Sequence, residues 1–133
     1  MKQLILIFLL SISFGYSQNV TMTEKELIPL LCRTWKINYD KSYGKITRTF
    51  PKAKQYDITF KSDFTFIVQM DDRKTVGEWC YETENKCVSI SMRGESVNQV
   101  ALVDKYQLIM IMRKDAKKKG KLFERNHGQF VPK

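Results

Sequence analysis

The chain has 133 residues, of which 43% are hydrophobic, 28% charged and 12% aromatic. This composition is too apolar for a disordered chain, and the length suits one domain, which excludes a multidomain enzyme. Lysine and arginine outnumber the acidic residues by 23 to 14, so a partner attracted over long range should be anionic.

The N-terminus predicts export. A lysine precedes residues 4–13 (LILIFLLSIS), an apolar run that is too short for a membrane span. Gly15 and Ser17 are small residues placed as in a cleavage site after Ser17. We therefore expect a signal peptide over residues 1–17, a mature domain over residues 18–133, and a secreted or periplasmic product without a transmembrane segment. An uncleaved anchor or a buried N-terminal strand is the alternative.

Residues 23–31 (TEKELIPLL) predict a short helix. Thr23 and Glu26 have the spacing of a capping box, and the leucines that follow share one side of the helix. Pro29 limits its length.

Downstream of this helix, apolar and polar residues alternate with a period of two, which is typical of strands with one buried face. Strands are expected over residues 35–39, 56–60, 64–70, 76–81, 88–92, 97–103, 106–112 and 122–125. Short strands joined by short turns predict an all-β, antiparallel, up-and-down β-barrel of about eight strands. Such a barrel holds its own side chains or one small ligand.

Three segments resemble a known family. The helix followed by residues 31–37 (LCRTWKI) resembles the opening of lipocalin-like domains, where Gly-x-Trp begins the first strand. Residues 57–66 (DITFKSDFTF) are similar to the family's strand-turn-strand, and residues 77–81 (GEWCY) to a later strand of small exported bacterial members. The resemblance spans residues 26–125 and implies a lipocalin-like, or calycin-like, fold with a short N-terminal helix.

Two positions depart from the family pattern. Arg33 and Phe64 stand where the family usually has glycine. We expect a different turn type at Phe64, because a side chain makes positive φ costly. The resemblance also implies that Trp35 closes one barrel end under Arg125 from the last strand, as a structural pair. A core Trp35 with a solvated Arg125 is the alternative.

The cysteines allow two interpretations. Cys32, Cys80 and Cys87 lack the paired spacings of a structural zinc site. If Cys80 and Cys87 face each other across a hairpin on its outward side, an exported protein can form a disulfide there. The other interpretation is three thiols that act as small apolar side chains.

No residue pattern in the chain predicts catalysis. The chain has one histidine, His127, which lies near the C-terminus in a stretch expected to fray, without a nucleophile motif. Asp71 and Asp72 are followed at once by Arg73 and Lys74, which favours a solvated turn over a metal site. We therefore expect no enzyme, no metal and no cofactor.

The inward positions are rich in aromatic and methionine side chains, which suit an apolar or amphipathic ligand. The candidate ligand-binding residues are Trp35, Tyr39, Tyr56, Phe60, Phe66, Trp79, Tyr81, Met92 and Met110. The same residues also suit a packed core, and we expect the barrel to be mostly filled, because small barrels are commonly closed by their own side chains. If a ligand binds, we expect its acid group to meet basic residues near a barrel mouth.

The surface offers a second kind of function. Residues 114–121 (KDAKKKGK) hold five lysines, expected at a solvated hairpin tip. The leading hypothesis is an exported, non-catalytic, lipocalin-like barrel that binds a small apolar or amphipathic ligand. The alternative is a filled barrel whose basic surface meets an anionic surface or an acidic protein, as an envelope-associated interaction, inhibitor or immunity module. Nucleic acid is a less suitable partner for an exported chain.

Overall fold

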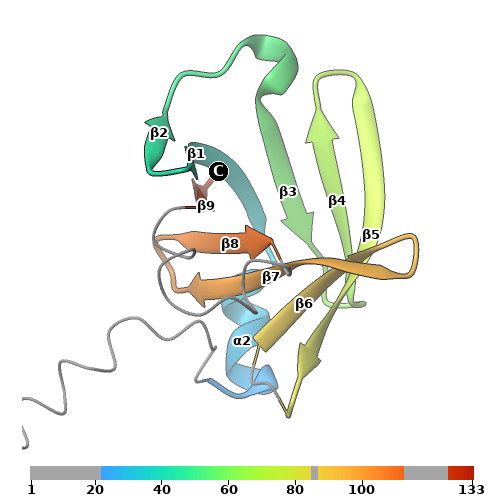
Figure 1. The fold of residues 1–133 in the computed structure, drawn as a ribbon. Coiled ribbons are helices and arrows are strands. Elements are labelled where there is room, and N and C mark those ends of the chain that lie inside the picture. The colour runs from blue at the N-terminus through green and yellow to red at the C-terminus, as the bar shows by residue number, and fades with distance from the viewer. Residues whose placement is uncertain (1–21, 85–86, 113–125) are drawn as a thin grey trace, which may run out of the picture.

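The computed structural model describes residues 22–84, 87–112 and 126–133. The elements are α2 (Glu24–Leu31), β1 (Thr34–Ser42), β2 (Lys45–Thr47), the 3₁₀ turn η1 (Lys52–Lys54), β3 (Tyr56–Phe60), β4 (Thr65–Met70), β5 (Arg73–Glu82), β6 (Cys87–Met92), β7 (Glu95–Val103), β8 (Leu108–Met112) and β9 (His127–Pro132). The strands pair antiparallel in the order β2, β1, β3 and then in sequence through β9. Because β1 also pairs with β9, the strands β1 and β3 through β9 close into a barrel, and β2 lies beside β1 (Figure 1). The predicted eight-stranded antiparallel barrel is confirmed.

The last strand closes the barrel. β9 pairs with β8 on one edge and with β1 on the other, where Phe130 lies opposite Ile37. The expectation that the stretch around His127 frays is therefore wrong, because both edges of β9 are paired and Phe130 is buried in the core. The strand expected over residues 122–125, the lysines of 114–121 and the signal peptide expected over residues 1–17 lie outside the described residues and stay predictions.

The helix α2 covers one end of the barrel (Figure 1). Its predicted capping box is present: the Glu26 amide donates to Thr23 Oγ1 at 3.3 Å, and the Thr23 amide donates to Glu26 Oε2 at 3.2 Å. Leu27 and Leu31 are buried against the barrel core. We call this end the closed end, and the end where Ser42 and Met70 lie the open end.

The strand register decides which candidate residues face the interior. Tyr39 faces outward, whereas the other predicted ligand residues face the interior. The pairing of β1 with β9 shifts between Ile37 and Tyr39, so that Tyr39 lies opposite Gln129 on the outer face. The expectation of an unbroken alternation through Tyr39 is thus wrong, because one extra residue in β1 reverses the sides of all that follow.

Phe64 adopts the left-handed conformation that a glycine would have at this turn. Its φ is 67°, so the expected change of turn type is wrong. The conformation costs a non-glycine residue about 1–2 kcal/mol. Two contacts offset this cost: the Phe64 ring lies 4.9 Å from the Trp79 ring, centroid to centroid, and the Phe64 carbonyl accepts from the Trp79 amide at 2.9 Å.

The arginine that contacts the Trp35 ring is Arg33, which lies two residues before it in the sequence. Arg33 Cζ lies 5.4 Å from the centroid of the fully buried Trp35 ring. Arg125 lies outside the described residues, so its pairing with Trp35 stays a prediction.

The cysteine pair is offset in the β5–β6 hairpin. Cys80 lies opposite Ser89, and Cys87 lies opposite Glu82, so the two cysteines are diagonal neighbours and not directly across from each other. Cys80 is exposed, whereas Cys87 is buried and its thiol donates to Glu82 Oε2 at 3.0 Å. The expected direct opposition across the hairpin is wrong, because the register is offset from it by two residues. Cys32 is half-buried next to α2.

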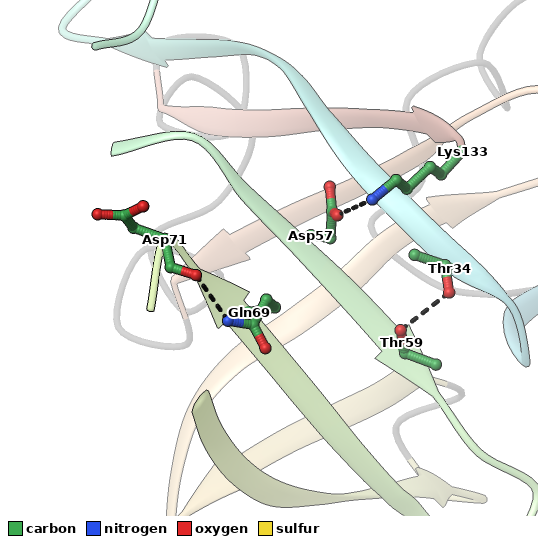
Figure 2. A network of polar contacts seen from close by, with 6 residues as sticks. All are labelled: Thr34, Asp57, Thr59, Gln69, Asp71 and Lys133. Carbon is green, nitrogen blue, oxygen red and sulfur yellow. Dashed lines mark hydrogen bonds and ion pairs between the residues drawn. The ribbon is translucent and has the colours of Figure 1, made fainter. Parts of the chain in front are cut away.

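Polar pairs cover the outer face where β1 and β3 are adjacent. Figure 2 shows Lys133 paired with Asp57, and Thr34 Oγ1 at 2.9 Å from Thr59 Oγ1. Thr34 and Thr59 are directly opposite in the register. Such exposed pairs add little stability, and they keep the outer side of the sheet polar.

The turn at Phe64 generates a stability prediction. Phe64→Gly and Phe64→Ala both lose the ring contact with Trp79, but only glycine adopts the positive φ without strain. We expect Phe64→Gly to be more stable than Phe64→Ala by about 1 kcal/mol in urea unfolding. An alanine variant as stable as the glycine variant would contradict the conformation assigned to this turn.

Candidate functional site

The two ends of the barrel are built differently. At the closed end, Trp35 Nε1 donates to the Leu31 carbonyl at 3.0 Å, and Trp79 Nε1 donates to the Lys61 carbonyl at 2.9 Å. Tyr81 Oη donates to the Met22 carbonyl at 3.1 Å. Each polar atom of these large side chains has a partner, so this end is packed and satisfied.

An apolar cavity of about 130 Å³ lies in the open half of the barrel. Its lining is Tyr56, Ile58, Phe60, Phe66, Val68, Ile90, Met92, Val97, Asn98 and Met110. Among the described residues, Tyr56 and Asn98 alone bring polar side-chain groups to it, and no charged side chain of this part of the chain lines it. The cavity therefore suits a small apolar group, although its volume is below the roughly 300 Å³ of a drug-sized site.

A polar mouth of about 250 Å³ adjoins this cavity. Its lining includes Asp40, Ser42, Asn126 and His127, together with Tyr56, Asn98 and Met110. These last three residues also line the apolar cavity, so the two spaces share a wall. An apolar recess that adjoins a polar opening is the form of a site for an amphipathic molecule.

The bulge in β1 brings a carboxylate into the mouth. With regular alternation after Ile37, Tyr39 would face inward and Asp40 outward. The register shift instead places Asp40 opposite Gly128, on the side of Phe130. Ser42 Oγ donates to Asp40 Oδ2 at 3.0 Å. Because of this one extra residue, the carboxylate of Asp40 faces the mouth and the ring of Tyr39 faces outward.

Tyr56 is held neutral at the boundary between cavity and mouth. Burial, with a smaller contribution from the charge of Asp40, raises the pKa of Tyr56 to about 12. Both effects disfavour a phenolate. The phenol is protonated at neutral pH, as an ordinary tyrosine is, and its raised pKa extends this state to strongly alkaline pH.

His127 and Tyr39 form a contact on the outer face. Tyr39 Oη lies 3.0 Å from His127 Nε2, and Arg48 Cζ lies 5.1 Å from the centroid of the Tyr39 ring. This contact joins β1 to β9 beside the mouth.

A second hollow of about 330 Å³ lies outside the barrel near Lys36, Lys52 and Lys133. Asp57 and Asp71 also line it, and Lys133 is paired with Asp57 (Figure 2). Its mixed charges give it no clear preference for an anion or a cation, so we place the candidate site at the open end.

The structure divides the predicted ligand residues into three groups. Tyr56, Phe60, Phe66, Met92 and Met110 line the apolar cavity. Trp35, Trp79 and Tyr81 close the opposite end, and Tyr39 lies outside.

Sequence reasoning missed Asp40 and Asn98. Asn98 stands in an expected strand between Val97 and Gln99, and two adjacent polar residues there gave no signal for which one faces inward. For Asp40 the sequence offers no such signal, because its side depends on the bulge.

Comparisons with family models, curated proteins and solved structures found no match. Within residues 22–84, 87–112 and 126–133, no three histidine, cysteine, aspartate or glutamate side chains are grouped to hold a metal ion. Among the helices that the structure describes, none is long and apolar enough to cross a bilayer. The geometry of the open end is therefore the basis for assigning a function.

The Tyr56–Asp40 proximity can be tested by titration. Asp40→Asn removes a negative charge, so the pKa of Tyr56 should move down toward its ordinary value, while burial keeps it raised. Ultraviolet titration of the tyrosines at alkaline pH should show the last midpoint at lower pH. Asp57→Asn is the matched control, since Asp57 pairs with Lys133 on the outer face. An unchanged last midpoint in Asp40→Asn would place Asp40 away from the phenol.

Proposed function

We propose that the protein is an exported, lipocalin-like barrel that binds one small amphipathic molecule at its open end, without catalysis. One observation carries the proposal: Tyr56, Asn98 and Met110 line both the apolar cavity and the polar mouth. A molecule with an apolar tail and a polar head can occupy both spaces at once. Export rests on the apolar run of residues 4–13, and membership of the family rests on the resemblance of the short motifs.

The mouth favours a ligand whose head donates hydrogen bonds. Among the described residues of its lining, the inward charged group is Asp40, and Asn98 adds an amide oxygen that can accept. An acid group, which we expected to meet basic residues, would lie near a like charge. Lys41 is also at the mouth but stands opposite His127, on the outer side. A hydroxyl or amine head therefore fits better than a carboxylate.

A filled barrel that acts through its surface is the second candidate. The apolar cavity alone is about 130 Å³, which holds only part of a typical ligand. If the mouth is occupied by water in solution, the interior has mainly a structural role. An envelope-associated interaction, inhibitor or immunity module would then use the basic exterior.

A hexyl series tests the binding proposal. Calorimetric titration with 1-hexanol, hexylamine and hexanoate compares three heads on one tail, so the differences report on the mouth. We expect hexanol and hexylamine to bind more tightly than hexanoate, and Asp40→Asn to reduce the preference for hexylamine over hexanoate. No binding of any of the three at millimolar concentration would favour the filled barrel.

A cavity-blocking pair locates the binding. Val68 lines the apolar cavity, whereas Val76, on the adjacent strand β5, is 64% exposed. Val68→Phe should weaken hexanol binding about tenfold or more, because the new ring occupies the tail site. Val76→Phe makes the same chemical change outside and should leave binding unchanged. Equal affinities of the two variants would show that hexanol does not enter this cavity.

A further inference from the structure

Charge is distributed unevenly between the two ends of the described barrel. We define the open rim by its loops and adjoining residues, which are 40–54, 71–74 and 92–95, and they hold eight basic and four acidic side chains. The loops and helix of the closed end are residues 22–33, 61–64, 82–84 and 104–107, and they hold four basic and six acidic side chains. The open rim is therefore the positive end, and an anionic partner should approach it first.

An aromatic residue projects from this rim. Ser42 pairs with Lys45, so the β1–β2 hairpin turns through Tyr43 and Gly44, with φ of 52° and 80°. The Tyr43 side chain is 81% exposed, and the nearby Ile46 is 46% exposed. The turn is fixed to the barrel because the Tyr43 amide donates to Asn126 Oδ1 at 2.7 Å.

The tip is built at a conformational cost. A two-residue hairpin turn with positive φ at both positions favours asparagine or glycine at the first. Tyrosine in the left-handed region costs about 1–2 kcal/mol, and such strained positions cluster at functional sites. The ring has no packing role that would offset this cost, since it is largely in solvent.

This combination matches the surface of a charged bilayer. Tyrosine is enriched at headgroup level because its ring is apolar and its hydroxyl is polar. Lysine and arginine near an anionic leaflet each gain about 1 kcal/mol. A soluble polyanion would use the positive rim but would leave Tyr43 and Ile46 without a contact.

We propose that the open rim docks on an anionic phospholipid bilayer, with the tip of the β1–β2 hairpin (Tyr43, Gly44 and Ile46) at headgroup depth. The rim alone is sufficient for this contact, so the inference goes beyond the ligand site and does not depend on it. Docking in this orientation turns the polar mouth toward the lipid surface, which would let an amphipathic molecule pass between bilayer and barrel.

Vesicle sedimentation with the mature chain tests the tip. We expect binding to phosphatidylcholine vesicles that contain phosphatidylglycerol, weaker binding at high salt, and little binding without phosphatidylglycerol. Tyr43→Asn suits the turn and should keep or raise the melting temperature, yet lower the vesicle affinity about tenfold. Tyr106→Asn is the matched control, because Tyr106 is 69% exposed in a closed-end loop. Equal losses in the two variants would overturn the proposal.

A charge pair of variants tests the orientation. Lys45→Gln with Lys52→Gln and Lys54→Gln removes three charges from the rim, and we expect about a hundredfold loss of vesicle affinity. Lys25→Gln with Lys61→Gln and Lys105→Gln removes three charges from the closed end, with a much smaller expected loss.

Either of two results would overturn the proposal: equal losses in the two triple variants, or retention on heparin without binding to vesicles. Hexanol titration of the same variants without vesicles reports separately on the ligand site.

Discussion

The pairing of β9 with β1 is the contact on which the rest of the structure depends. A sheet with one apolar face must cover that face and its two edges, and closure does both. The contact brings Phe130 opposite Ile37 inside, with Tyr39 opposite Gln129 outside. If β9 left its place, β1 and β8 would become edges, and Asp40 would lose the strand that defines its side of the wall.

Closure also explains why the ends differ. The helix α2 and the two tryptophans use the closed end for packing, with each indole nitrogen donating to a carbonyl. Both indoles and the Tyr81 phenol therefore contribute to the packing of this end. At the other end, Asp40, Asn98 and the phenol of Tyr56 line the polar mouth, which adjoins the apolar cavity. The tightly packed residues and the candidate site thus lie in opposite halves of the interior. This is expected when buried polar groups are confined to a functional site.

The predictable features were those with local causes. The capping box of Thr23 and Glu26 depends on residues that are close in the sequence, and so does the alternation in β3 to β6. The barrel was predictable because it follows from that alternation. The closing strand was missed because Gly128 and Pro132 are poor strand formers, and a distant partner holds them. The bulge at residues 37–39 and the positive φ of Phe64 depend likewise on β9 and on Trp79, which are remote in sequence. Asp40 was missed for the same reason.

Hydrogen exchange at the backbone amides of β9 tests the closure most directly. In a closed barrel, the paired amides of β1 and β9 should exchange as slowly as those of the β5–β6 hairpin, because all open only with the barrel. Amides of residues 127–131 that exchange at the rate of an unstructured chain, beside a protected β5–β6 hairpin, would contradict the account. The chain would then be an open sheet, without the mouth formed between β1 and β9.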